Sequence, residues 1–149
     1  MCTAITFKTK DHYFGRNLDL ERSYGERVVI TPRNFVLDMR CVAGLTEHYA
    51  MIGMATVAEG YPLYYEATNE KGLSMAALNF PDNADYKPYL EGCDNITSFE
   101  FIPWILGKCA DVSEALSELS KINLVNISFG ESLPLSPLHW IISDRERSI

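Results

Sequence analysis

The sequence predicts an α+β protein in which strands come first and helices follow. Two observations support this prediction. Apolar and polar residues alternate at the start of the chain, so that Ile5 and Phe7 fall on one face of a strand headed by Cys2. Helix-start signals occur only from Thr97 onward. We therefore expect a strand-rich first portion followed by a helical segment.

The first portion contains several further expected strands. Residues 13–15 predict a strand that precedes a polar, glycine-punctuated loop, RNLDLERSYGE. Residues 27–31 predict the next strand. The run YAMIGMATV at 49–57 is apolar almost throughout, which predicts a strand buried on both faces. Residues 61–68 and 73–80 flank the turn NEKG and predict a hairpin.

A loop and a first helix are expected next. Residues 81–95 are rich in Pro, Asp and Asn and predict an exposed loop. Thr97 and Glu100 fit a capping box ahead of FEFIPWILG. Pro103 is expected to kink this helix.

A second helix and a last strand complete the pattern. Asp111 and Glu114 fit another capping box. The helix after it carries one apolar stripe, which predicts a core-facing side made of Val112, Ala115, Leu116, Leu119 and Ile122. Residues 138–143 predict a strand and 144–147 a hairpin turn, with two residues left for the returning strand. We therefore expect one domain over residues 1–149 that is incomplete at its C-terminus.

Charge and composition narrow the classes of function. Lys and Arg number 13 against 20 Asp and Glu, for a net charge of −7, which argues against nucleic acid or an anionic membrane as a partner. A small amphipathic molecule fits this balance better. No apolar run reaches the ~18 residues of a membrane-spanning helix, and no signal peptide is recognisable. We expect a cytoplasmic protein.

The cysteines and histidines give little support to a metal site. In the cytoplasm Cys2, Cys41, Cys93 and Cys109 are expected to be free thiols. They form no C-x-x-C pair, and the three histidines are scattered along the chain, so zinc is not expected.

Cys2 carries the most specific chemistry. Removal of Met1, which is usual before a small second residue, would leave Cys2 with a free α-amine beside its thiol. A thiol with a pKa of ~8.5 needs a base to ionise, and an α-amine with a pKa of ~7.7 to 8.0 suits that task at neutral pH. One residue would then supply nucleophile and base for acyl transfer. The alternative is that Cys2 is an ordinary second residue.

Three other residues are candidate partners for this nucleophile. Arg16, in YFGRNLD, is a permanent cation that can stabilise a thiolate, and Asp19 can accept a hydrogen bond from the α-amine. Asn79, in LNFP, is a candidate donor to the oxyanion. Simpler interpretations exist, since Arg16 and Asp19 could form a solvated surface pair and Asn79 could serve turn geometry.

A cysteine–histidine arrangement is the competing scheme. Cys2 with His12, His48 or His139 would suffice chemically, but none of these histidines lies in a recognisable local motif. The N-terminal amine scheme is therefore favoured.

The segments MCTAI, YFGRNLD, TPRN, NEKGL, AALNFP, FEFIPW and LPLSPLHW together resemble the choloylglycine hydrolase family. The resemblance covers essentially all 149 residues and is closer to bile salt hydrolases than to penicillin V acylases. It implies an N-terminal-nucleophile hydrolase fold, an αββα sandwich of antiparallel sheets, of which this chain resembles the N-terminal half. It also implies a homotetramer at full length and no metal or organic cofactor.

The resemblance further implies roles for individual residues. Cys2 matches the nucleophile, Arg16 the arginine beside its sulfur, and Asp19 the carboxylate that contacts the α-amine. Asn79 matches the oxyanion asparagine, where penicillin V acylases tend to carry tyrosine. Apolar residues after Asp19 and at 133–138 are candidate walls for a steroid.

The implied reaction is hydrolysis of the amide bond of glycine- or taurine-conjugated bile salts through a thioester. Two alternatives stay open. One is the same chemistry on penicillin V or another N-acyl amide, and the other is an inactive fragment, since family members draw a further oxyanion asparagine and a further arginine from a second half.

Overall fold

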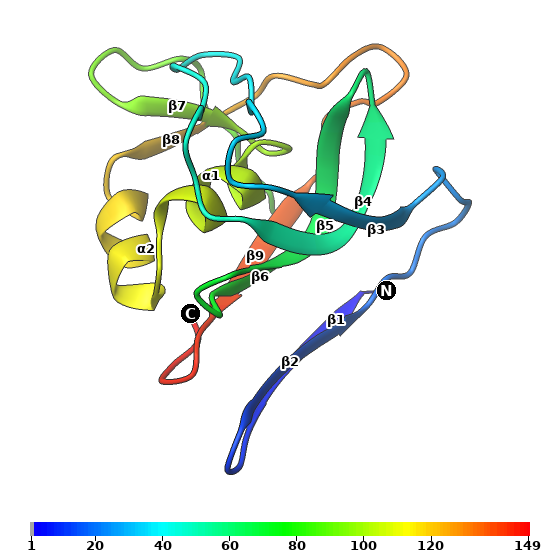
Figure 1. Cartoon of the computed structure of the whole chain (residues 1–149). Helices are drawn as coiled ribbons and strands as arrows, with labels where there is room; N and C mark the ends of the chain where they lie inside the picture. Colours follow the sequence, from blue (N-terminus) through cyan, green and yellow to red (C-terminus); the bar gives the residue numbers. More distant parts are fainter. Residues whose placement is uncertain (1) are drawn as a thin grey trace.

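The computed structural model describes residues 2–149 and has a five-stranded antiparallel sheet at its centre (Figure 1). The strand order is β3-β4-β5-β6-β9. The bounds of these strands are β3 Arg27–Thr31, β4 Met51–Ala58, β5 Tyr61–Asn69, β6 Ser74–Asn79 and β9 Leu138–Ser143.

Smaller elements surround this sheet. A separate antiparallel hairpin consists of β1 (Thr3–Lys8) and β2 (His12–Asn17), and a parallel pair consists of β7 (Asp94–Thr97) and β8 (Ile122–Val125). The two helices of the described chain are α1 (Phe101–Lys108) and α2 (Val112–Leu119). The mixed α+β class predicted from the sequence is confirmed.

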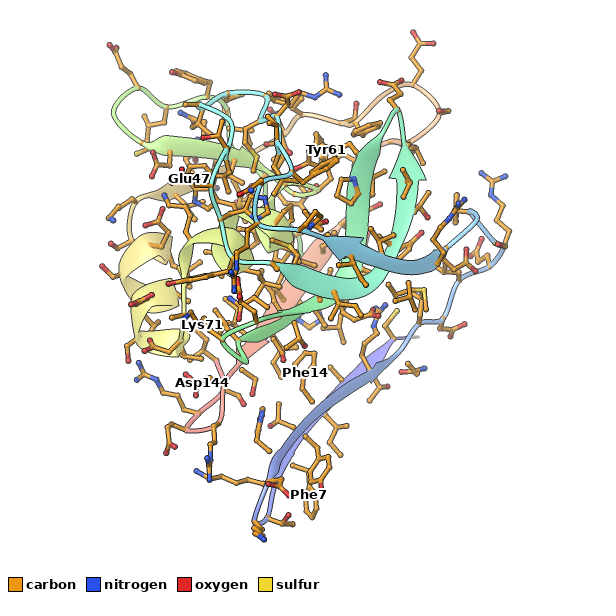
Figure 2. All side chains as sticks on the ribbon, viewed as in Figure 1. Phe7, Phe14, Glu47, Tyr61, Lys71 and Asp144 are labelled. Carbon is orange, nitrogen blue, oxygen red and sulfur yellow. The ribbon has the colours of Figure 1, made fainter. Side chains whose placement is uncertain are left out.

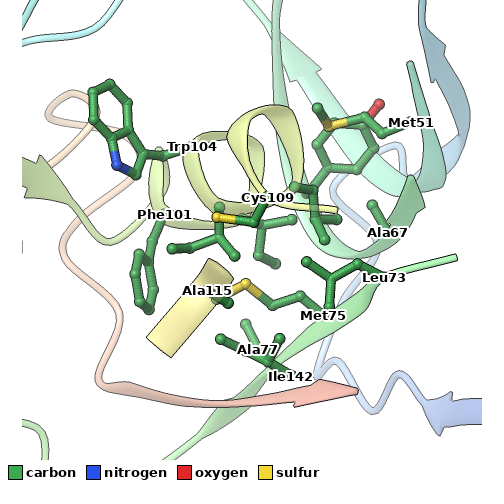
Figure 3. Packing of buried hydrophobic residues seen from close by; sticks show 14 of the residues in the cluster. Met51, Ala67, Leu73, Met75, Ala77, Phe101, Trp104, Cys109, Ala115 and Ile142 are labelled. Atoms are coloured by element: carbon green, nitrogen blue, oxygen red, sulfur yellow. The ribbon is translucent and has the colours of Figure 1, made fainter. Parts of the chain in front are cut away.

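The two faces of the sheet have different neighbours (Figure 1). The inner face packs on α1, and Figure 3 shows Phe101 and Cys109 above Met75, Ala77 and Ile142 in the buried core. The outer face carries Glu66 and the apolar side chains Val28, Ile30 and Ile52. The β1–β2 hairpin lies on the outer side, next to β6 and β9, with its tip pointing away from the sheet.

The outer face is not covered where β3 and β4 pair. Ile30 is 68% exposed and its partner Ile52 is 48% exposed. The expectation that the strand at 49–57 is buried on both faces is therefore wrong, because the outer face of β4 is open to solvent at Ile52.

A β-bulge in β5 decides which side chains reach the outer face. Tyr64 pairs with Ala55 while Glu66 pairs with the neighbouring Met54, so Tyr65 is an extra residue. Consecutive residues of β4 point to opposite faces, and therefore Tyr64 points inward and Glu66 outward although they are two residues apart. Regular alternation would have put both on the same face.

The same region marks where β5 separates from β6. Their pairing ends at Glu66 and Ala76, and the earlier residues of β5 pair only with β4. Ala77 on β6 thus lies just beyond the last β5 partner.

The predicted hairpin around NEKG is confirmed, and Asn69 connects it to α1. The Asn69 side-chain amide donates to Leu106 O and Cys109 O, both at 2.8 Å. Its side-chain oxygen accepts hydrogen bonds from the backbone N–H groups of Lys71 and Leu73. One buried side chain therefore satisfies terminal carbonyls of the helix and shapes the turn.

The first capping box is only half correct. The carboxylate of Glu100 accepts from Thr97 N at 3.0 Å, but the Thr97 hydroxyl has no hydrogen-bond partner among the described residues. Thr97 instead ends β7, and α1 begins at Phe101. Pro103 is consequently the third helical residue, where a backbone N–H has no intrahelical partner, so the reason for a kink is absent.

The second helix begins as predicted but ends earlier. Asp111 accepts a hydrogen bond from Glu114 N at 2.9 Å, as an N-cap does. Val112 and Ala115 are buried, whereas Leu116 is 41% exposed and Ile122 opens β8, so both were wrongly assigned to the helix stripe.

Other boundaries also shift. The second strand runs to Asn17, so Arg16 belongs to β2 and not to the loop after it. The expected loop at 81–95 includes the start of β7. The predicted turn at 144–147 is confirmed, because Asp144 N donates to Arg147 O at 3.0 Å and Ile149 pairs with Ile142.

Gly53 provides a stability test of the sheet. A Cβ atom at this position would lie 1.9 Å from Glu66 O and 2.6 Å from Ala67 Cα, which are backbone atoms of the neighbouring strand. We expect Gly53→Ala to lower the free energy of unfolding by ~1–3 kcal/mol, because the added methyl group overpacks the sheet. Urea denaturation would measure this. Gly130→Ala is the control, because nothing lies within 4 Å of its added Cβ, and equal stability of the two variants would contradict the prediction.

Glu70 provides a pH test of the NEKG turn. Hydrogen bonds from Arg33 and from Ala50 N lower the pKa of Glu70 from 4.5 to about 2. Because the pKa is lower in the folded state, the stabilisation is present above pH 4.5 and is lost as pH falls toward 2. We expect Glu70→Gln to lower the urea midpoint at pH 7 more than at pH 3. A difference independent of pH would show that the ionised carboxylate does not stabilise the fold.

Candidate active site

Cys2 lies directly before β1 and is partly exposed. Its thiol donates to Asp19 O with a distance of 3.9 Å between sulfur and oxygen. Thr3 N donates to the side-chain oxygen of Asn17 at 2.6 Å, which fixes the start of β1 against the end of β2. The structure thus brings Cys2 and Asp19 together, although 17 positions separate them in the chain.

The register of the β1–β2 hairpin puts Cys2 and Arg16 on one face. Ala4 pairs with Arg16, and Thr6 with Phe14. Side chains two apart in a strand share a face, so Cys2 lies on the side of Ala4 and diagonally across from Arg16, at about the 7–8 Å typical of such neighbours. Figure 2 shows Phe14 between the hairpin and the sheet, so this face is turned toward the sheet.

Arg16 is buried and tied to the sheet. Its side chain is 4% exposed, and Nη1 lies 3.2 Å from the carboxylate of Glu66. Nη2 donates to Ala77 O at 2.7 Å, just beyond the point where β5 leaves β6. The interpretation of Arg16 as half of a solvated surface pair is therefore wrong, because it is a strand residue that faces the sheet.

One nitrogen of the Arg16 guanidinium has no partner in the described chain. The Nε–H group is buried and has no hydrogen-bond partner among residues 2–149. Buried donors are normally satisfied, so an unpaired one on the hairpin face that carries Cys2 indicates a site for an anion or a carbonyl oxygen.

Glu66 was not identified from the sequence. Burial raises its pKa, while the charge of Arg16 and the hydrogen bond from Met54 N act in the opposite direction. The available signal was a single acidic residue inside the otherwise uncharged strand YPLYYEAT. Its partner could not be named from sequence, because the bulge decides which way Glu66 points.

Asn79 ends β6 and is exposed. It lies two residues along the strand from Ala77, or roughly 7 Å from the carbonyl group that binds Arg16. The last of the residues at 133–138 come close here, because Phe80 N donates to Pro137 O at 2.8 Å and Asn79 pairs with Leu138. The end of β6 thus lies near both the Arg16 guanidinium and the loop before β9.

The three histidines are occupied elsewhere. His12 contacts the hydroxyl of Ser143 at 3.0 Å and lies at the opposite end of the hairpin from Cys2, roughly 20 Å away along β1. Both ring nitrogens of His48 lie 2.8 Å from backbone carbonyl oxygens, and the ring of His139 stacks on Phe80. In the described part of the chain none is hydrogen-bonded to Cys2, so the competing cysteine–histidine scheme gains no geometric support.

Other features do not coincide with this cluster. Two open hollows, of about 470 and 490 Å³, are lined largely by charged side chains, and none of the four candidate residues lines either. Figure 2 labels Lys71, which borders both, and Asp144, which borders one.

Between residues 2 and 149 no group of three or more His, Cys, Asp or Glu side chains could hold a metal ion. No helix in this range is long and apolar enough to cross a membrane.

Comparison with known families agrees with the resemblance seen in the sequence. Residues 2–149 match the model of the linear amide C–N hydrolases of the choloylglycine hydrolase family. The chain therefore belongs to the choloylglycine hydrolase family.

Individual relatives are similar over the whole chain. It is 55% identical over 149 residues to a bile salt hydrolase/transferase of Lactiplantibacillus plantarum, covering 100% of this chain and 46% of that protein. It is 42% identical over 153 residues to a conjugated bile acid hydrolase of Lactobacillus gasseri, covering 100% of this chain and 48% of that protein. The chain thus spans about half the length of the curated relatives it matches.

Solved structures show the same extent of similarity. A mutant conjugated bile acid hydrolase from Clostridium perfringens superposes with a TM-score of 0.92 at 38% identity, over 100% of this chain and 47% of that one. A penicillin V acylase from Agrobacterium tumefaciens has a TM-score of 0.72 at 17% identity, over 97% of this chain and 43% of that one, which shows a shared fold. The fold of this chain thus matches about half of the length of each of these solved structures.

The cysteines should differ sharply in reactivity. Burial raises the pKa of Cys109 to about 12, and its side chain is only 2% exposed, whereas Cys2 is partly exposed. Because the thiolate is the reactive form, we expect iodoacetamide at pH 8 to modify Cys109 at least ~100-fold more slowly than Cys2 in the folded protein. Peptide mass spectrometry with and without urea would measure this, and equal rates in the folded state would contradict it.

Proposed function

We propose that the protein hydrolyses the amide bond of glycine- or taurine-conjugated bile salts, with Cys2 as the nucleophile. The observation that carries the proposal is the buried guanidinium of Arg16 on the same face of the hairpin as Cys2, with its Nε–H group unpaired. The names of the relatives in L. plantarum and L. gasseri support this substrate class.

The proposed mechanism begins with the N-terminus. Met1 lies outside the described residues, and the proposal requires its removal so that the α-amine belongs to Cys2. The amine accepts the thiol proton, and Arg16 stabilises the thiolate. Asp19, whose backbone carbonyl already lies beside the sulfur, contacts the amine and orients it.

Two acyl-transfer steps follow. The thiolate attacks the amide carbonyl carbon, and a C–S bond forms while the oxygen becomes negatively charged. Asn79 donates to this oxyanion, and one such donor is worth about 10²–10³ in rate. The C–N bond then breaks, and the protonated α-amine gives its proton to the departing glycine or taurine nitrogen. Water, deprotonated by the amine, cleaves the thioester and releases the bile acid and the thiol.

Two parts of the structure support an amphipathic substrate. Leu20 follows Asp19 and is partly buried, and Pro137 and Leu138, the last of the residues at 133–138, lie beside the end of β6. We assign both as walls for the steroid. Asparagine at position 79 favours bile salts over penicillin V, for which the resemblance leads us to expect tyrosine.

The exposed outer face supports a fuller architecture. Val28, Ile30 and Ile52 form an apolar surface over β3 and β4. We propose that in the whole protein a second sheet stacks on this face, as in the αββα sandwich of the family, and that four such proteins form a homotetramer.

Turnover assays test the proposed function. The gene product that contains these residues should release glycine or taurine from glycocholate and taurocholate faster than it hydrolyses penicillin V. Cys2→Ala should abolish release, because no nucleophile remains, while Cys41→Ala should retain it. Intact mass should show that Met1 is absent.

Three outcomes would reject this assignment. Faster turnover of penicillin V would replace the substrate class. Full activity in a protein that retains Met1 would exclude the α-amine as base. No turnover of any amide would favour the inactive alternative.

A further inference from the structure

We propose that Glu66 is a positioning residue that holds the guanidinium of Arg16 beside Cys2. This inference deepens the proposed function and rests on it, since it assumes that Arg16 serves the Cys2 thiolate. The family resemblance seen in the sequence concerned Cys2, Arg16, Asp19 and Asn79, and did not include Glu66.

The contacts of Arg16 leave its guanidinium little freedom. Glu66 binds Nη1 on one side, and Ala77 O binds Nη2 on the other. An unanchored arginine side chain has many rotamers, and ordering one costs up to ~2 kcal/mol. With both terminal nitrogens held, Nε is the one guanidinium nitrogen that has no hydrogen-bond partner in the described chain, so its N–H is free to interact with a reacting group.

Glu66 is itself held in place. One carboxylate oxygen accepts from Met54 N at 3.3 Å, and the other faces Arg16. Its side chain is 23% exposed, so it is largely screened from water. The carboxylate is therefore oriented by the backbone of β4 before it binds Arg16.

The β-bulge explains why a glutamate is available at this point. The extra residue Tyr65 lets β5 bury Tyr64 on the inner face and still present Glu66 on the outer face. Arg16 also lies close enough to Tyr65 to lower the pKa of its hydroxyl group, against the stronger raising effect of burial. The bulge thus places Glu66 on the outer face of the sheet, the side on which the N-terminal hairpin lies.

Position and charge predict opposite effects on the Cys2 thiol. If Glu66 acted only through its negative charge, removing it would make the surroundings of Cys2 more positive and lower the thiol pKa. If Glu66 holds Arg16 in place, removing the side chain frees the cation to move away, and the thiol pKa rises. The sign of the change therefore distinguishes the two roles.

The test measures the rate at which iodoacetamide modifies Cys2 as a function of pH. Glu66→Gln removes the charge but keeps an oxygen that can accept from Arg16, whereas Glu66→Ala removes both. We expect Glu66→Ala to raise the thiol pKa by about one unit, so that modification at low pH is about tenfold slower. Glu66→Gln should leave the thiol pKa of Cys2 at its wild-type value or lower it. Glu66→Val, which suits a strand, is a second variant without the oxygen.

Matched controls separate this role from general destabilisation. Glu70 also forms an ion pair with an arginine, Arg33, close to the end of the same strand, and Glu70→Ala should leave the Cys2 pKa unchanged. Thermal unfolding of each variant identifies those that fold cooperatively.

Each outcome decides the proposal. A thiol pKa at or below the wild-type value in both Glu66→Ala and Glu66→Val would overturn it, as would an equal rise in Glu66→Gln. Because modification of Cys2 requires no bile salt, the result stands apart from the turnover assays. If the wild-type protein shows no turnover of conjugated bile salts but the variants show the expected order of thiol pKa values, the result would count against the substrate and not against Glu66.

Discussion

The ion pair between Arg16 and Glu66 joins the N-terminal hairpin to the sheet, and the candidate site depends on it. A buried charge is tolerated only when it is paired and hydrogen-bonded, so a guanidinium that is 4% exposed fixes how the hairpin sits on the outer face. The contacts near the hairpin tip are weaker in kind. Lys8 and Glu146 form an exposed pair, and the hydroxyl of Ser148 donates to that of Thr6. The hairpin is therefore bound to the sheet more strongly at the end that carries Cys2 than at its tip.

Much of this arrangement follows from local sequence patterns. Alternation at the start of the chain predicted the first strand, and the NEKG turn predicted the hairpin of β5 and β6. The short segment YFGRNLD pointed to Arg16 and Asp19, because a thiol at the N-terminus needs a cation and a carboxylate nearby. The backbone carbonyl of Asp19 does lie beside the Cys2 thiol, whereas the contact of its carboxylate with the α-amine stays a prediction. These features could be predicted since each depends on residues close together in the chain, or on a family resemblance that covers them.

Features that depend on long-range packing could not be predicted. Glu66 is 50 positions from Arg16, and its direction depends on a single extra residue in β5. The helical spacing of the apolar residues extends to Ile122, yet parallel pairing with β7 makes Ile122 the first residue of β8. Leu116 fits the stripe in sequence but is exposed. In each case the position of the residue depends on which distant segment packs against it, or on the absence of such a segment. The local sequence pattern does not show either.

Asn69 shows how specific a single amide can be. Its NH₂ group donates to two carbonyls at the end of α1 while its oxygen accepts two N–H groups of the turn. Aspartate has nearly the same shape, but it could not donate, and it would place a negative charge at the negative end of the helix dipole. Two side chains that are almost superimposable are thus opposite in effect here. Chemical deamidation at this one position would act on the helix and the hairpin together.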